Sequence, residues 1–472
     1  MKNDRPIVQA LKKFIANEPQ SLHVPGHKNG LLSNLPNEIK RALIYDVTEL
    51  TGLDDFHHPE EAILQAEQLL AEVYEANRSF FLVNGSTVGN LAMVYATCKQ
   101  GDTVLVQRNA HKSIFHALEL VGVNPVYLAP KWHEESKTAG CVEKETLQEA
   151  IKRFPHVKAV IFTYPTYYGI TVKDLEEQIE LCHSLGIPVL VDEAHGAHLI
   201  ASEQLPKSSL QLGADVVVQS AHKTLPAMTM ASFLHMKSTL VSEEKVNHYL
   251  RMLQSSSPSY LLLASLDDAR SYVENYTESD FVYLMGKRKQ FIESLQTLTE
   301  LQIIEVDDAL KLLVRAPGYT GFELKDALEK MHVYVELADV QQVLLILPLL
   351  KHGENYSFAD LRIRMKEAVI YLKNAPGILQ DITANFEMTN ISQPQLSFAE
   401  IEQAKKEWIP YMRAIGRVAA SMIIPYPPGI PLFVPGEKIT VAKLSQLEEL
   451  LAIGATFQGE HRLQEKCIYV IK

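Results

Sequence analysis

Short apolar segments alternate with helical patterns between about residues 61 and 275. Seven of these segments have the length of buried strands: Phe80–Val83, Val104–Gln107, Val126–Leu128, Ala159–Thr163, Val189–Val191, Val216–Gln219 and Ser232–His235. Strands that are separated by helical patterns indicate parallel βαβ units. We therefore predict a large α/β domain with a mainly parallel seven-stranded sheet.

The pattern changes after residue 275 to that of a smaller α+β unit. Strands are expected at Leu312–Arg315, Val333–Glu336 and Val343–Leu347, and helices at Phe322–Met331 and Phe358–Leu372. A polar linker at Asn390–Leu396 precedes a C-terminal segment. The predicted organisation is an arm at 1–60 with a short helix at Leu11–Ile15, a large domain at 61–275, a small domain at 276–390 and a C-terminal segment at 391–472.

Two charged residues follow successive predicted strands. Asp192 comes directly after Val189–Val191, and Lys223 follows Val216–Gln219. In an open α/β sheet the ligand lies beyond the carboxyl ends of the strands. A pyridoxal phosphate site needs such a pair, because the lysine holds the cofactor as a Schiff base and the acid keeps the pyridine nitrogen protonated. A lysine after an apolar run is more often a solvated residue at the end of a strand. Asp192 and Lys223 alone therefore do not establish a pyridoxal phosphate site.

A third feature is the turn that follows Phe80–Val83. Gly85 permits close approach of the backbone, Ser86 and Thr87 offer hydroxyl groups, and a helix that starts here would present free N–H groups to a phosphate. The same turn would also serve as an ordinary helix cap. No G-x-G-x-x-G sequence follows any of the predicted strands, which disfavours a nicotinamide cofactor.

Further motifs occur in a fixed order along nearly the whole chain: Leu22–Lys28, Asp46–Asp55, Asn84–Thr87, Arg108–Ser113, Asp192–His198, Ser220–Lys223, Ser255–Tyr260 and Tyr426–Pro431. In this set the sequence resembles the Orn/Lys/Arg decarboxylases, which are pyridoxal phosphate (PLP) enzymes of fold type I, the fold of aspartate aminotransferase. Together the motifs are specific, whereas each alone would be weak.

The resemblance implies a role for each matching residue. Lys223 would bind the cofactor covalently, Asp192 would pair with its ring nitrogen, His111 would stack on the ring, and His195 would lie near the phenolic oxygen. The phosphate would be held by Gly85, Ser86, Thr87, Ser220 and His222 and by Ser255 and Ser257 of a neighbouring subunit, so that a homodimer shares its active sites. The catalytic set would be Lys223, Asp192, His222 and His195, and the sequence does not identify the proton donor.

Structural alternatives remain for several of these residues. His111 could simply start a helix, and the Ser255–Ser257 run could be a surface loop. His195 and His198, with Asp192 and Glu193 close by, superficially suit a metal site. A metal hydrolase would leave Lys223 and the Ser-Thr turn without roles, and we predict no metal.

The resemblance implies decarboxylation of a basic amino acid that feeds polyamine synthesis, with arginine favoured over lysine and ornithine because no receiver-like wing precedes Leu22–Lys28. Acidic residues available for the cationic side chain include Asp54, Asp55, Glu336 and Glu437. The PLP-binding residues alone would also suit an aminotransferase or another lyase, or a silent PLP-binding protein.

Composition adds limits to the function. The chain has 472 residues with 47% hydrophobic content, enough for two or three domains. A net charge of −12 argues against nucleic-acid binding. The four scattered cysteines, the absence of a secretion signal and the absence of a long apolar run predict a cytoplasmic protein that does not enter membranes.

Overall fold

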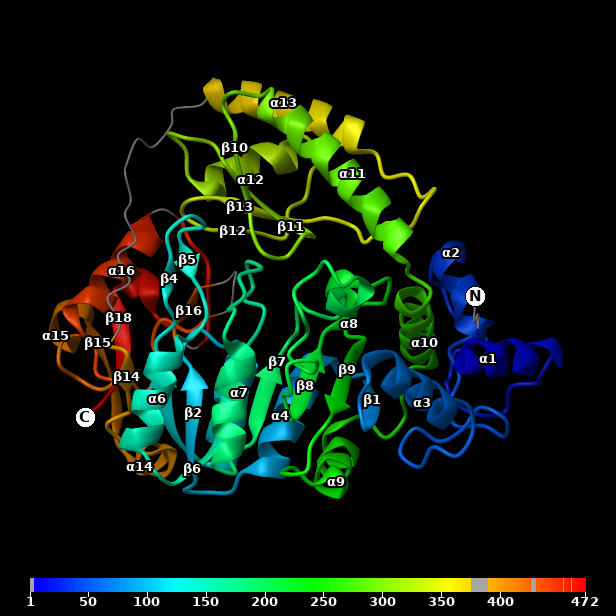
Figure 1. The fold of residues 1–472 in the computed structure, drawn as a ribbon, viewed down its shortest axis with the longest axis horizontal. Helices are drawn as coiled ribbons and strands as arrows, with labels where there is room; N and C mark the ends of the chain where they lie inside the picture. Colours follow the sequence, from blue (N-terminus) through cyan, green and yellow to red (C-terminus); the bar gives the residue numbers. More distant parts are fainter. Residues whose placement is uncertain (1–3, 375–388, 426–429, 453, 460) are drawn as a thin grey trace. The chain divides into compact units, whose positions relative to one another are not determined.

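The computed structural model describes residues 4–374, 389–425, 430–452, 454–459 and 461–472. The chain divides into two compact units, which are coloured along the sequence in Figure 1. The first unit combines Met1–Thr97 with Ile179–Thr277, and the second combines Cys98–Gln178 with Glu278–Lys472. Helix α7 (Leu175–Ser184) spans a limit between them. These units do not test the domain limits expected from the sequence, which stay a prediction.

The first unit contains four strands in the order β1-β9-β8-β7. They are β1 (Arg78–Leu82), β7 (Val189–Asp192), β8 (Val216–Gln219) and β9 (Ser232–Met236). Strands β7 and β8 are parallel, and β9 runs antiparallel to both of its neighbours. The carboxyl ends of β7 and β8 therefore lie at the same edge, where Asp192 and the segment that carries Lys223 begin.

Helix α4 (Gly85–Thr97) packs against β8 and β9 of this unit. A Cβ atom on Gly89 would lie only 2.8 Å from side-chain atoms of both Leu82 and Val218. The helix thus approaches the strands too closely for any larger residue at this position. This close packing fixes the first turn of α4, which carries Ser86, and the next turn, which carries Asn90.

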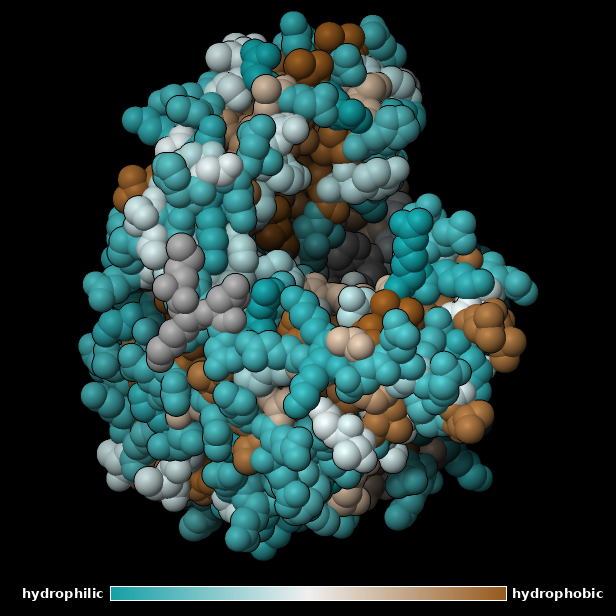
Figure 2. All heavy atoms as spheres, turned by 90° about the vertical axis from the view of Figure 1, so that its right-hand side faces the viewer, coloured by the Kyte–Doolittle hydropathy of each residue, from teal (hydrophilic) through white to brown (hydrophobic). Residues whose placement is uncertain are grey.

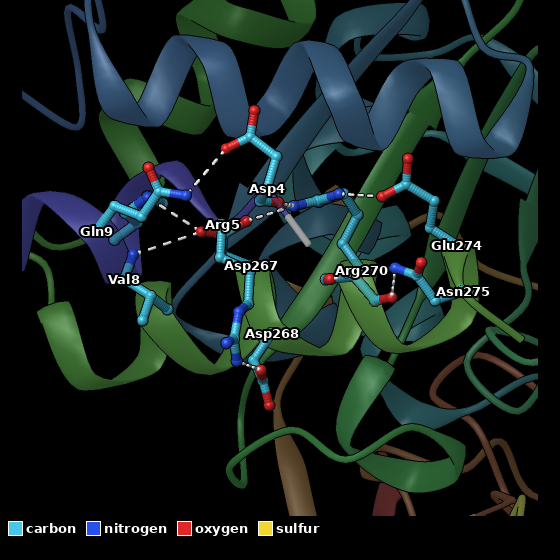
Figure 3. A network of polar contacts seen from close by, with 11 residues as sticks. Asp4, Arg5, Val8, Gln9, Asp267, Asp268, Arg270, Glu274 and Asn275 are labelled. Atoms are coloured by element: carbon cyan, nitrogen blue, oxygen red, sulfur yellow. Dashed lines mark hydrogen bonds and ion pairs between the residues drawn. The ribbon is translucent and has the colours of Figure 1, made fainter. Parts of the chain in front are cut away.

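The N-terminal helix α1 (Pro6–Ala16) packs against α3 (Ala62–Tyr74) and α10 (Tyr260–Glu274). Its first turn is capped from a distance, because the Asp267 carboxylate accepts hydrogen bonds from the N–H groups of Ile7 at 3.0 Å and Val8 at 3.5 Å. The guanidinium group of Arg270 holds the other oxygen of Asp267 at 2.9 Å, as Figure 3 shows. A buried ion pair within α10 therefore supplies the carboxylate that anchors the first turn of α1.

The other elements of the first unit are short or peripheral. They are α2 (Asn37–Lys40), η1 (Arg41–Ile44), η2 (Leu199–Ala201), α8 (Ala221–Thr224) and α9 (Glu243–Leu253). Helix α9 packs against α4.

The second unit contains the parallel strands β6 (Val157–Thr163), β2 (Thr103–Gln107) and β3 (Asn124–Leu128). The short strand β14 (Ile391–Ser392) pairs antiparallel with β3. Helices α5 (Lys112–Val121) and α6 (Lys144–Arg153) connect the strands, and β4 (Trp132–His133) and β5 (Thr138–Ala139) form a small hairpin.

The α+β part of this unit has its own four-stranded antiparallel sheet in the order β10-β11-β13-β12. Its elements are β10 (Gln302–Glu305), β11 (Lys311–Arg315), β12 (Leu337–Ala338), β13 (Val343–Ile346), α11 (Glu278–Gln296), α12 (Gly321–Lys330) and α13 (Phe358–Lys373). Their apolar faces form one core cluster.

The C-terminal segment forms a separate small core. Its elements are α14 (Phe398–Gln403), β15 (Lys406–Pro410), α15 (Tyr411–Ala414), β16 (Ile424–Pro425), α16 (Val441–Ala452), β17 (Phe457–Gln458), η3 (Leu463–Glu465) and β18 (Cys467–Ile471). Strands β15 and β18 pair antiparallel, as do β16 and β17.

All seven strands predicted for the large domain are present, so the mainly parallel α/β class is confirmed. The predicted strand at Val333–Glu336 is wrong, because the chain turns at His332 with a φ of 57° and a two-residue strand forms only at Leu337–Ala338. The linker expected at Asn390–Leu396 contributes β14. Most of the proline-rich loop, Tyr426–Gly429, lies outside the described residues.

Candidate active site

Asp192 is the last residue of β7 and is 2% exposed. Its carboxylate accepts hydrogen bonds from Asn90 Nδ2 at 3.0 Å and from the N–H of Ala194 at 3.2 Å. Burial raises the pKa of Asp192, while the charge of Lys223 and these two hydrogen bonds act in the opposite direction. A carboxylate in this setting is stabilised by any cation that is placed beside it.

Lys223 lies in the single turn of α8 that follows β8. Its Nζ atom is 3.0 Å from Nε2 of His195, which is buried in the turn after Asp192. A protonated amine can only donate, so the ring nitrogen accepts. The structure thus brings together three residues that the sequence singled out, from the ends of two parallel strands.

The predicted phosphate turn begins α4. Gly85 has a φ of 79°, and a Cβ atom built on it meets nothing within 4 Å. Ser220 Oγ donates to Ser86 Oγ at 2.8 Å, so the turn and the residue after β8 are in direct contact. Thr87 is exposed in the first turn of the helix. The arrangement leaves open space beside a helix N-terminus and two hydroxyl groups, which suits an anion.

His222 is held beside β9, because its Nδ1 atom lies 3.0 Å from the carbonyl oxygen of Ala231. Ser255 and Ser257 are exposed. The N–H of Ser255 donates to Asn84 Oδ1 at 3.0 Å, and the carbonyl oxygen of Ser255 lies 2.9 Å from His57 Nε2. This segment is therefore fastened beside the Gly85–Thr87 turn of its own chain.

His111 belongs to the second unit and caps α5, where its Nδ1 atom accepts a hydrogen bond from the N–H of Ser113 at 3.3 Å. The structural role considered from the sequence is therefore present. Stacking of His111 on a cofactor stays a prediction.

Comparison with known proteins gives two matches to family models. Residues 5–312 match the major domain of the Orn/Lys/Arg decarboxylases, and residues 378–460 match the C-terminal domain of the same family. The chain belongs to the Orn/Lys/Arg decarboxylase family. It is a PLP-dependent amino-acid decarboxylase.

Individual relatives align with almost the whole of this chain. It is 42% identical over 476 residues to the Bacillus subtilis protein named Uncharacterized protein YaaO, with 98% of each chain covered. It is 33% identical over 493 residues to an arginine decarboxylase of Bacillus subtilis, with 100% of this chain and 98% of the relative covered. The crystal structure of the Francisella novicida lysine decarboxylase LdcF has a TM-score of 0.81 at 22% identity and covers 99% of this chain and 81% of that one. The expected fold type I is thus confirmed.

The residues of the first unit suit PLP. Burial raises the pKa of Asp192 and so disfavours its ionised form. The positive charge of a pyridinium nitrogen would stabilise that ionised form. The space at the Cβ position of Gly85 is open, because no atom lies within 4 Å of it. Lys223 offers a primary amine from the next strand end.

Several acids that the sequence offered for a cationic substrate are occupied in the decarboxylase. Asp54 accepts the backbone N–H groups of Glu60, Glu61 and Ile63 at 2.9 Å each and so caps the start of α3. Asp55 accepts the N–H of His57 at 2.8 Å. Both carboxylates therefore hold the backbone of the segment that leads into α3.

The other two acids are also engaged. Glu437 is buried and accepts two hydrogen bonds from Arg108, at 3.1 and 2.9 Å, and one from Lys443 at 2.5 Å. The charges of Arg108 and Lys443 lower the pKa of Glu437 despite its burial. Glu336 accepts the Tyr167 hydroxyl at 2.7 Å. Among the residues described, no group of three or more His, Cys, Asp or Glu side chains could hold a metal ion.

Sequence analysis missed Asn90, the amide that holds Asp192. The available signal was a polar residue four positions after Ser86, on a helix that is otherwise mostly apolar. It also gave no role to Glu193, Gln219 and His235, which are completely buried.

No helix in the described part of the chain is long and apolar enough to cross a membrane.

Proposed function

We propose that this decarboxylase removes the α-carboxyl group of arginine, with lysine as the second candidate. The name of the Bacillus subtilis relative at 33% identity over the full chain carries this proposal. Three other relatives named arginine decarboxylase, at 30–31% identity, support it. Relatives named lysine decarboxylase are 24–25% identical, which is why lysine comes second.

We assign the cofactor-binding roles within the first unit as follows. Lys223 would hold PLP covalently, Asp192 would pair with the ring nitrogen, and His195 would lie beside the phenolic oxygen. Gly85, Ser86, Thr87, Ser220 and His222 would bind the phosphate. When bound, PLP withdraws electrons from the α-carbon of an amino acid and so permits loss of carbon dioxide.

The protein side of this chemistry rests on proton control. Asp192 needs a negative charge to keep a pyridinium protonated, and Asn90 and the N–H of Ala194 stabilise that charge by donating to it. His195 lies 3.0 Å from the amine of Lys223 and can accept a hydrogen bond from it. Lys223 and His222 are the candidates for returning a proton to the α-carbon.

The first test concerns Lys223. Borohydride reduction of the PLP-loaded protein and peptide mapping should place the pyridoxyl group on this residue, and Lys223→Ala should lose both the label and turnover. Lys237→Ala changes a lysine just after β9 and serves as the control. A label on another lysine would contradict the assignment.

The second test concerns the reaction. Purified protein supplied separately with arginine, lysine and ornithine should release carbon dioxide fastest from arginine and form agmatine. Cadaverine or putrescine as the main product would replace arginine by lysine or ornithine. A keto acid whose formation requires an added acceptor would indicate a transaminase, and no turnover would favour a silent PLP-binding protein.

We further propose a homodimer in which Ser255 and Ser257 contact the phosphate of the neighbouring subunit. Support comes from the N-terminal arm, which exposes Leu22 at 97%, Leu31 at 77% and Leu32 at 68%. Hydrophobic residues are also exposed among hydrophilic ones on the face drawn in Figure 2. Exposed apolar groups of this size favour burial against a second copy.

Subunit mixing tests the shared site. A Lys223→Ala chain mixed with a Ser255→Ala/Ser257→Ala chain should regain part of the activity, because one site of each heterodimer would be intact. If verified heterodimers stay inactive, Ser255 and Ser257 serve the phosphate turn of their own chain, beside Asn84.

We place the protein in the cytoplasm and its amine product in polyamine synthesis. Burial raises the pKa of the Cys98, Cys141 and Cys182 thiols to about 12, which keeps them protonated and unreactive. Such free thiols suit a reducing compartment. Cell fractionation and measurement of polyamines in a deletion strain test both points.

A further inference from the structure

Glu193 follows Asp192 directly and is 0% exposed, yet no step of the proposed chemistry uses it. One carboxylate oxygen accepts a hydrogen bond from Gln219 Nε2 at 2.6 Å. The other accepts from the Ser209 N–H at 2.6 Å and from the Ser209 hydroxyl. Three donors therefore converge on this side chain.

The chain of hydrogen bonds continues beyond Gln219 in one direction. The Gln219 amide oxygen lies 3.1 Å from His235 Nε2, and His235 Nδ1 lies 2.8 Å from Ser79 Oγ. An amide oxygen can only accept, so Nε2 carries the proton and Nδ1 accepts from the serine. Burial lowers the pKa of His235 to about 3, so the ring is neutral. Tyr74 stacks on this ring with 4.2 Å between centroids.

All four polar members of this chain, Ser79, His235, Gln219 and Glu193, are 0% exposed. Buried polar groups are costly unless every partner is satisfied, so such a chain holds its members in one arrangement. The backbone is shaped to fit it as well. A Cβ atom on Gly196 would lie 2.5 Å from Glu193 Cγ, so only glycine leaves room for the carboxylate in this turn.

The position of the chain relative to the candidate site gives it a role. Glu193 is the residue after Asp192, and Gln219 is the residue before Ser220. Their side-chain hydrogen bond thus joins the ends of β7 and β8, the two strands that carry Asp192 and Lys223. The main chain adds a parallel link, because the Glu193 N–H donates to the Val218 carbonyl at 2.9 Å.

We propose that Glu193 and Gln219 are positioning residues, whose hydrogen bond fixes the spacing of the two strand ends and so holds Asp192 and Lys223 in place for the cofactor. The inference rests on the proposed function, since it assigns those two residues to PLP. It requires a hydrogen bond between positions 193 and 219 and does not require the negative charge to be at 193.

An exchange of the two side chains tests this requirement. Glu193→Gln places an amide between donors, and Gln219→Glu places two carboxylates against each other, so each single variant should bind PLP about tenfold more weakly or worse. In the double variant, the new amide at position 193 can donate to the new carboxylate at position 219 and accept from Ser209. That carboxylate can also accept from His235. PLP affinity and the visible absorption spectrum of the bound cofactor should then return to within about twofold of the parent.

A matched control is Glu67→Gln in the same unit. Glu67 is also buried, and it accepts hydrogen bonds from Arg78 at 2.7 Å and the Phe81 N–H at 3.0 Å. This variant should lower the unfolding temperature and leave the affinity for PLP unchanged. It separates loss of stability from loss of positioning.

Two results would overturn the inference. Single variants that bind PLP like the parent would show that the bond positions nothing. A double variant that unfolds at the parent's temperature but binds as weakly as the single variants would show that the charge at position 193 matters and the bond does not. Failure of the proposed function is distinguishable, since it would appear as PLP attached to a lysine other than Lys223 in the parent itself.

Discussion

Two buried aspartates of the first unit both lose the hydration of their negative charge, but different groups compensate for this loss. Asp192 at the end of β7 and Asp267 in α10 both have a pKa that burial raises. Asp267 contacts a guanidinium directly, with Arg270 Nη2 at 2.9 Å, and its other oxygen caps α1. Asp192 receives hydrogen bonds from one side-chain amide and one backbone N–H, and Lys223 acts on it through its charge.

The difference separates a structural carboxylate from one that is available for chemistry. The charge of Asp267 is balanced by a cation that cannot leave, because the Arg270 guanidinium also donates to Glu274 at 2.6 Å and to the carbonyl of Asp4. The charge of Asp192 is stabilised by two neutral donors and by the charge of Lys223, so in our proposal it stabilises the ring nitrogen of the cofactor. Burial alone therefore does not mark a functional acid; its partners do.

The largest effect is expected on stability, from Arg270→Met. This change leaves Asp267 buried without its cation and should lower the free energy of unfolding by about 3–5 kcal/mol. Urea denaturation measures the loss, and turnover per folded molecule should be retained. Asp268→Asn is the control, because its contact with Arg5 is half exposed and should contribute less than about 1 kcal/mol. Equal losses in the two variants would remove the distinction drawn for Asp267.

The next effect is expected on turnover, from Asp192→Asn. The amide keeps the shape but removes the charge that would hold a pyridinium protonated, so kcat should fall about 10²- to 10³-fold while PLP remains bound. Steady-state kinetics and the cofactor absorbance measure both quantities. Near-normal kcat would mean that another group serves the ring nitrogen and that Asp192, like Asp267, is structural.

A smaller effect is expected on the free energy of unfolding when the pH changes. Burial raises the pKa of Glu193 from 4.5 to about 7, so the folded protein binds a proton that the unfolded chain has already released between these values. The contribution of Glu193 to the free energy of unfolding is fully present below pH 4.5. It falls by about 3 kcal/mol as the pH rises to 7. Urea denaturation across this range should show a decline that is about 3 kcal/mol smaller in Glu193→Gln than in the parent, because Glu67, whose pKa burial also raises to about 7, contributes the same decline in both. Parallel pH profiles would contradict the shift.

Much of the architecture could be predicted because it depends on local patterns. The apolar runs that became β7 and β8 were visible in the sequence, and so were Asp192 and Lys223 at their ends. Helix α1 was predicted only at Leu11–Ile15 but begins at Pro6, where a proline suits the first helical position and the distant carboxylate of Asp267 caps the first turn.

The candidate site was predictable to the same extent. His195 and Ser86 were found through motif order, and the structure brings each of them to a predicted neighbour. Asn90 and Gln219 were missed, since their importance comes from contacts across the fold. The sequence also does not show that the four acids available for the substrate contact backbone N–H groups, cations or, for Glu336, a tyrosine hydroxyl.

The cap on α1 has a consequence for synthesis of the protein. Ile7 and Asp267 are separated by 260 positions, and 98–178, which belongs to the other compact unit, is made in between. At ribosomal speeds of about 5–20 residues per second, the first turn of α1 waits roughly 13 to 50 s for its cap, whereas α3, which also packs against α1, is made much earlier. The nascent chain can thus pack α1 against α3 early, whereas the first turn of α1 is capped only after Asp267 has been made.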